Sequence, residues 1–77
     1  GVDPLAARAR KYVDADSPLK ALHLLDMALR VSPDHAPSLE VRKLALEQLL
    51  TLGGRENLSE TLLLESAIAE VEKGLAK

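Results

Sequence analysis

Apolar side chains recur along this chain at the spacings of an amphipathic helix, and no stretch alternates with a period of two residues. Proline, glycine and short polar residues divide the pattern into four segments. The helices are expected to begin at Pro4, at Pro18, after Asp34 and after Asn57. We therefore predict an all-α fold of four antiparallel helices, a helix-turn-helix unit followed by a C-terminal helical hairpin.

The starts and stops of the first three helices have local signals. Asp3 is expected to cap the first helix, because Pro4 after it suits a first helical position. Ser32-Pro33 should end the second helix, since proline disfavours the α conformation of the residue before it. Asp34 is then expected to cap the third helix.

The segment between the third and fourth helices is rich in glycine and charge. Gly53-Gly54 is expected to end the third helix, and Asn57 with Glu60 forms an asparagine version of the capping box. Glycines ahead of a helix N-terminus can also bind an anion, but the glutamates here already supply negative charge. We therefore interpret Gly53-Gly54 as a helix stop.

The first three helices differ in how much of their surface is apolar. The first has one apolar stripe, formed by Leu5, Ala6, Ala9, Tyr12 and Val13. The second is expected to be the most buried, with half of its circumference covered by Ala21, Leu22, Leu24, Leu25, Ala28, Leu29 and Val31. The third has Val41, Leu44, Ala45 and Leu52 on one apolar face and Leu39, Leu46 and Leu50 on the other. A helix with two apolar faces is expected to lie between neighbours.

The fourth helix carries more apolar residues than one buried stripe needs. The stripe itself consists of Leu64, Ala67, Ile68, Val71 and Leu75. Beyond it, the helix has Leu58, Leu62 and Ala69 on a second face and Leu63 on a third. We predict these four residues as candidates for a protein interface. In the alternative interpretation, Leu58 and Leu62 pack under the Gly53-Gly54 loop against Leu50.

Composition narrows the class of protein. The chain has 77 residues, of which 47% are hydrophobic and 29% charged, and it is rich in leucine and alanine, so we expect residues 1–77 to form a single helical domain. It begins with Gly1 rather than methionine, which we interpret as excision from a larger protein. A net charge of −2 with 1% aromatic residues argues against nucleic acid as a partner. No apolar run is long enough for a membrane span, so no membrane partner is expected either.

Candidate chemistry is sparse. There is no cysteine, and the two histidines are too few for a self-contained metal site, so we predict no metal, no cofactor and no catalytic residue. His23 and Asp26 are three residues apart on one helix and can form an ion pair or a surface metal contact. His35 is expected to be a turn residue. No serine shows a histidine and a carboxylate nearby in the pattern of a nucleophile.

Residues 2 to 35 resemble a tetratricopeptide repeat, a helical hairpin of about 34 residues. The large and small apolar positions of that pattern are occupied, in order, by Leu5, Ala9, Tyr12, Ala21, Leu25, Ala28 and Pro33. The alanines are expected to let the two helices approach closely. The resemblance weakens where Arg8 replaces the usual leucine and where Lys43 stands in place of a small residue. It implies a module that binds other proteins.

The stretch from Lys20 to Leu50, followed by a glycine-led loop and ENLSE, is similar to a second family. It looks like the helical segment that follows the catalytic domain in alkylsulfatase-type hydrolases of the metallo-β-lactamase fold, where that segment serves in dimerisation. The resemblance implies a hydrolase as parent protein, although the chain contains no His-x-His-x-Asp-His run of that family's metal site.

The sequence therefore predicts a protein–protein interaction or dimerisation module that is not itself an enzyme. Its expected partner is a second copy or the catalytic domain of a parent protein. Two alternatives remain: an accessory C-terminal domain of an alkylsulfatase-like hydrolase, or a fragment of a tetratricopeptide scaffold that binds peptides.

Overall fold

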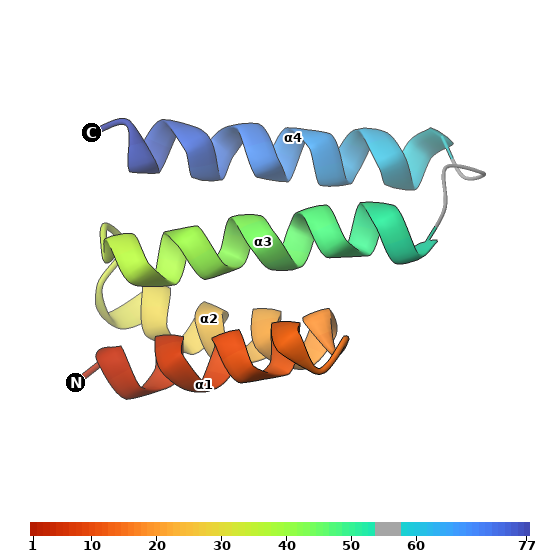
Figure 1. Cartoon of the computed structure of the whole chain (residues 1–77). Coiled ribbons are helices and arrows are strands. Elements are labelled where there is room, and N and C mark those ends of the chain that lie inside the picture. Colours follow the sequence, from red (N-terminus) through yellow and green to blue (C-terminus); the bar gives the residue numbers. More distant parts are fainter. Residues whose placement is uncertain (54–57) are drawn as a thin grey trace.

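The computed structural model describes the backbone of residues 1–53 and 58–77 and the side chains of residues 1–52 and 59–77. It contains the helices α1 (Asp3–Asp14), α2 (Pro18–Val31), α3 (Ala36–Gly53) and α4 (Leu58–Leu75), and no strand within the described residues. The all-α class predicted from the sequence is confirmed. Consecutive helices run antiparallel, so the two chain ends lie at the same end of the bundle (Figure 1).

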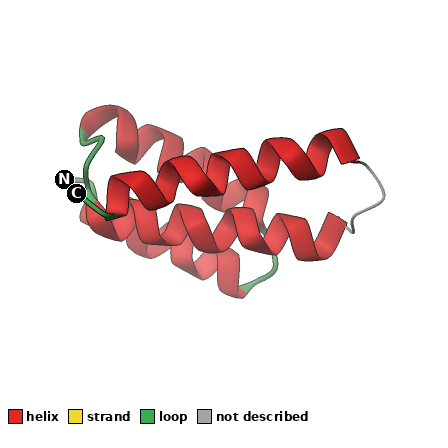
Figure 2. Cartoon of the chain, turned by 90° about the horizontal axis from the view of Figure 1, so that it is seen from above, coloured by secondary structure: helices red, strands yellow, loops and turns green. Residues whose placement is uncertain are grey.

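The helices form a flat molecule with α3 at its centre. α1 and α2 lie side by side on one side of α3, and α4 lies on the opposite side (Figures 1 and 2). The principal extents are 38 × 28 × 16 Å. In the described part of the chain, α3 approaches all three other helices closely, whereas α4 approaches only α3. The prediction that the third helix lies between neighbours is therefore confirmed.

A first cluster of buried side chains joins α1, α2 and α3. Its members Ala9, Ala21, Leu25 and Ala45 have no exposed surface, and Val41 is 7% exposed. The small alanine side chains allow the helices to approach closely, as expected, while Leu25 fills the space between them. Partly buried apolar residues complete the cluster: Tyr12, Val13, Leu22 and Leu24.

A second cluster joins α3 to α4. Leu39, Leu46 and Val71 form its buried centre, and they are surrounded by Leu22, Leu29, Leu64, Ala67, Ile68 and Leu75. Near the end of α4, a side-chain carbon on Gly74 would lie 3.1 Å from Leu39 Cδ1, so glycine permits a close approach of α4 to α3 there. The predicted stripe of α4 is therefore the face that packs on α3.

α2 and α3 bury about the same fraction of their described residues, so the expectation that the second helix is the most buried is not confirmed. Two other details of the predicted core are wrong. Val31 at the end of α2 is 75% exposed, although the sequence pattern placed it in the apolar stripe. On α3, Leu44 and Leu52 are exposed rather than packed on the same face as Val41 and Ala45.

Two of the predicted caps are also wrong. α1 has Val2 at its cap position and Asp3 inside the helix, where the carboxylate makes no capping hydrogen bond. α3 begins at Ala36, directly after His35, and the carbonyl of His35 accepts the first helical hydrogen bond from Leu39 N–H (3.1 Å). His35 thus takes the capping position that we predicted for Asp34. α3 extends to Gly53, while Gly54 of the predicted helix stop and Asn57 of the predicted capping box lie outside the described residues.

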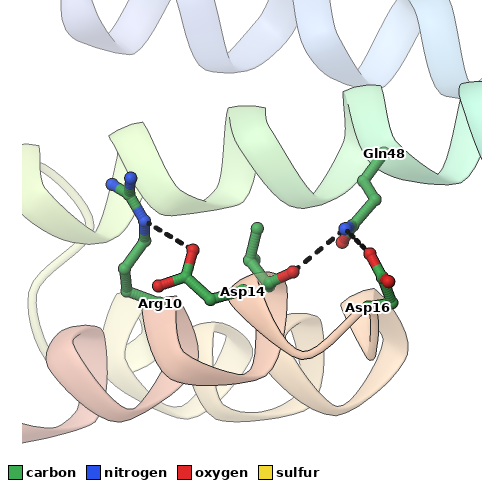
Figure 3. Close-up of polar contacts among 5 residues, drawn as sticks. Arg10, Asp14, Asp16 and Gln48 are labelled. Carbon is green, nitrogen blue, oxygen red and sulfur yellow. Dashed lines mark hydrogen bonds and ion pairs between the residues drawn. The ribbon is translucent and has the colours of Figure 1, made fainter.

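The turn between α1 and α2 is held by a side chain of α3. Asp16 adopts a left-handed conformation (φ 58°), in which the helix cannot continue. The last turn of α1 is closed by two backbone hydrogen bonds, from Asp16 N–H to Val13 O (3.1 Å) and from Ser17 N–H to Tyr12 O (2.8 Å). Gln48 Nε2 donates to both Val13 O and Asp16 Oδ1, each at 3.0 Å (Figure 3). This contact fixes the C-terminal end of α1 against α3.

Candidate functional site

The predicted interface residues of α4 lie outside the stripe that packs on α3. Leu62 is 55% exposed and Leu63 is 72% exposed, values similar to those of Leu19 (69%) and Val31 (75%) on α2. Ala69 is also exposed. The side chain of Leu58, the fourth predicted residue, lies outside the described residues. Three of the four candidates are therefore accessible to a partner, and none of these three contributes to a core cluster.

The three accessible candidates do not all point in the same direction. Leu62 and Ala69 are seven residues apart, which places them above one another on the helix surface. Leu63 lies about 100° further round, because one helical turn takes 3.6 residues. Leu62 and Ala69 thus share one face of α4, and Leu63 lies on another. The alternative interpretation, in which Leu58 and Leu62 pack under the Gly53-Gly54 loop, involves side chains outside the described residues and stays a prediction.

Charged side chains border the apolar residues of α4. Lys43 Nζ on α3 lies 3.2 Å from Glu72 Oε2, and Lys73 Nζ lies 4.0 Å from Glu70 Oε2. Three glutamates, Glu47, Glu65 and Glu72, line a shallow open hollow between α3 and α4 together with Leu50, Thr51 and Ile68. In the described part of the chain, no group of three potential ligands is arranged to hold a metal ion.

A histidine, a serine and an aspartate meet where α1 and α3 begin. His35 Nε2 lies 2.7 Å from Asp3 Oδ1, and His35 Nδ1 lies 2.6 Å from Ser38 Oγ. Ser38 therefore has a histidine and, beyond it, a carboxylate nearby in space, an arrangement that the sequence analysis did not anticipate. The spacing of His35 and Ser38 resembles a capping box and is visible in the sequence. The approach of Asp3, 32 residues before His35, depends on the packing of α1 beside α3 and gives no local signal.

The geometry of these three residues is that of a helix cap. Ser38 N–H donates to His35 Nδ1 (3.3 Å), so this nitrogen is an acceptor and Nε2 carries the proton that is donated to Asp3. The ring nitrogen thereby satisfies one of the free N–H groups at the start of α3. Ser38 has no exposed surface, and its hydroxyl is out of reach of a substrate. These contacts position α1 against α3.

His23 does not form the contact with Asp26 that the sequence suggested. Asp26 Oδ2 instead pairs with Arg30 Nη2 one turn later (3.1 Å). His23 is exposed and borders a shallow, mostly apolar hollow on α1 and α2, together with Tyr12, Leu19, Lys20 and Leu24. Lys20 Nζ lies 5.8 Å from the centre of the Tyr12 ring in this hollow. Neither histidine is part of a cluster of metal ligands in the residues that the structure describes.

Among the described residues, no helix combines the length and the apolar character needed to cross a membrane. The chain matches no protein-family model, and neither the curated proteins nor the solved structures contain a match to it.

Proposed function

We propose that this chain is a protein–protein interaction module that self-associates through the outer face of α4 and has no active site of its own. The observation that carries the proposal is the exposure of Leu62 (55%), in line with the exposed Ala69, on a helix that packs closely against only one other helix within the described residues. Exposed leucines on one element favour association, because burying them removes apolar surface from water.

The total surface of the molecule supports the same proposal. The chain exposes 5127 Å², whereas a folded monomer of 8.3 kDa is expected to expose roughly 4,600 Å². An excess of about 500 Å² is in keeping with the flat shape of the molecule, whose shortest extent is 16 Å. A small domain of this kind gains stability when a second copy covers the open side.

We propose that the chain has no active site because the side chains of Asp3, His35 and Ser38 are already engaged in contacts with one another. In the contact of Asp3, His35 and Ser38, the hydroxyl is buried, and the Nδ1 lone pair that would act as a base already accepts the Ser38 N–H. A nucleophile needs both a free base and access for the substrate. We therefore expect the chain to hydrolyse no ester of a sulfate, a phosphate or a carboxylic acid.

The two family resemblances offer a context for this proposal. A tetratricopeptide-like unit in residues 2 to 35 is supported by the close packing of Ala9, Ala21 and Leu25, and such units act in binding proteins. The resemblance to the helical segment of alkylsulfatase-type hydrolases points to dimerisation beside a catalytic domain. In both settings, the partner is a protein and the chemistry is supplied elsewhere.

Light scattering after gel filtration tests the proposal. We expect twice the monomer mass of 8.3 kDa at micromolar concentration, and a shift toward the monomer for Leu62→Lys, which places a charge in the apolar contact. Leu19→Lys is the matched control, because Leu19 is 69% exposed on α2, away from α4. Circular dichroism should show that both variants keep their helices.

A chain that remains monomeric at millimolar concentration would contradict self-association. The outer face of α4 would then be assigned to docking on a parent domain. Equal dissociation by Leu19→Lys and Leu62→Lys would place the interface elsewhere on the molecule.

A further inference from the structure

We infer that an acidic, amphipathic helix of a partner protein binds to α1 and α2 on the surface that carries Arg8, Tyr12, Lys20, Leu24 and Met27. We call this surface the α1–α2 groove. It is separate from the interface proposed on α4, so the inference goes beyond self-association. It rests on a hollow between the two helices, on exposed apolar side chains that continue from the hollow, and on the sign of the charges around it.

The hollow is formed by α1 and α2 without a residue of α3 among its described lining residues. It is lined by Tyr12 from α1 and by Leu19, Lys20, His23 and Leu24 from α2. Tyr12 and Leu24 also pack against the first core cluster, so they give the hollow an apolar floor. A depression between two packed helices is the shape into which the side chains of a third helix fit.

Exposed apolar side chains extend the hollow along α2. Leu24, Met27 and Val31 follow Lys20 at intervals of four, three and four residues, so all four lie on one side of the helix. Met27 is 46% exposed and Val31 is 75% exposed. This line spans about three helical turns. A bound helix uses apolar contacts over several turns in the same way.

The charges around the groove are positive. Arg8 lies four residues before Tyr12, one turn away on the same side of α1, and Lys20 Nζ lies 5.8 Å from the centre of the Tyr12 ring. Within the described part of the chain, neither Arg8 nor Lys20 forms an ion pair. Asp16, in the turn before α2, accepts a hydrogen bond from Gln48 instead. Both cations are therefore available to carboxylates of a partner.

The three acidic side chains of α1 and α2 are engaged outside the groove. Asp3, at the start of α1, contacts the imidazole that caps α3 (2.7 Å). Asp14 lies two residues after Tyr12, and Asp26 lies two residues after Leu24. Two residues turn a helix by about 200°, so each is on the opposite side of its helix. Each forms an ion pair with an arginine of its own helix, at 3.4 and 3.1 Å. A positive groove on a chain of net charge −2 is complementary to an acidic partner.

The shape of the groove favours a protein over an anionic membrane. A segment that lies on a membrane presents a convex helix with an apolar face. Here the apolar and positive side chains border a hollow between two helices. An amphipathic helix can fill this hollow with its apolar side and place glutamate or aspartate beside Arg8 and Lys20.

Peptide selection tests the inference. A phage library of random peptides is selected against the chain, and the dissociation constants of the enriched peptides are measured by fluorescence anisotropy. We expect amphipathic peptides of net negative charge that become helical when bound. The double variant of Arg8→Glu and Lys20→Glu should weaken their binding by about tenfold or more, because like charges then face each other. Met27→Gln keeps the length of the side chain and adds no charge, and it should weaken binding by a smaller factor through the loss of apolar contact.

Two variants on α4 serve as controls. Lys73, whose side chain is 77% exposed, lies on the other side of α3, so Lys73→Glu should change peptide binding by less than about twofold. Leu62→Lys should also leave it unchanged, which separates this inference from the proposed self-association. Circular dichroism shows whether each variant keeps its helices.

Four results would overturn the inference. The library yields no binding peptide, or the enriched peptides show no excess of aspartate and glutamate. Alternatively, Lys73→Glu weakens binding as much as the double variant, which would indicate a general effect of charge. Finally, the chain binds phosphatidylserine vesicles and loses this binding in the double variant, which would assign the groove to a membrane surface.

Discussion

Helices α1 and α4 both pack on α3, but α1 also packs on α2, whereas α4 has no second neighbouring helix within the described residues. α1 lies against α2 as well as α3, and its buried residues Ala6 and Ala9 are 4% and 0% exposed. α4 packs closely on α3 alone within the described residues and leaves Leu62 and Leu63 largely exposed. The helix that is covered from two sides buries the centre of its apolar stripe, whereas the helix that is covered from one side leaves large apolar side chains in contact with water.

The polar contacts of α1 with α3 also differ from those of α4 with α3. At its start, α1 contacts His35, the residue before α3, through the exposed side chain of Asp3; at its end, the partly buried hydrogen bond from Gln48 Nε2 to Val13 O joins α1 to α3. The contact between α3 and α4 includes the ion pair of Lys43 with Glu72, whose side chains are 34% and 53% exposed. Hydrogen bonds that are partly buried stabilise more than ion pairs in contact with water. We therefore expect substitutions to cost more in the α1–α2–α3 unit than in its contact with α4.

Leu25→Ala is expected to have the largest effect. Leu25 is completely buried among α1, α2 and α3, and truncating a buried leucine leaves a cavity that costs about 2–5 kcal/mol of the free energy of unfolding. Urea unfolding measured by circular dichroism gives this value. The control Leu63→Ala, at a largely exposed position on α4, should stay within about 0.5 kcal/mol of the original chain. A loss below about 1 kcal/mol for Leu25→Ala would place the core elsewhere.

His35→Ala is expected to cost about 1–2 kcal/mol of unfolding free energy, because it removes the cap of α3 and the hydrogen bond to Asp3. His35→Asn separates the two contributions. Asparagine caps a helix N-terminus well but is too short to reach Asp3, so this variant should lose only part of the stability. Urea unfolding of both variants provides the measurement. Equal losses for alanine and asparagine would show that the cap contributes nothing.

The helices and most of the core were predictable because their signals are local. The period of apolar residues and the positions of proline gave α2 its correct bounds, and the alanines at 9, 21 and 28 are completely buried. Leu52 was placed in the core wrongly because its burial depends on how far neighbouring helices extend. Gln48 already contacts the end of α1, so Leu52, one turn further along α3, lies beyond that helix.

The polar contacts were less predictable. The sequence shows that His35 and Ser38 are three residues apart, but the approach of Asp3 follows from which helices pack together. The excess of leucine on α4 was visible in the sequence. The seven-residue spacing of Leu62 and Ala69 already places them on one face and Leu63 on another, and the structure adds that this stripe lies outside the residues packed on α3.

The ion pair of Lys43 with Glu72 is expected to have the smallest effect. A double-mutant cycle with Lys43→Met and Glu72→Gln should give a coupling of about 0.2–1 kcal/mol, since both side chains are in contact with water. The coupling should fall at high salt, because salt screens exposed charges. Unfolding is measured in urea, which adds no ions of its own. Lys43 stands where the tetratricopeptide pattern has a small residue, and the structure directs its ammonium group to α4. A coupling well above 2 kcal/mol would mean that α4 is held as firmly as α1, and the contrast between the two helices would then be lost.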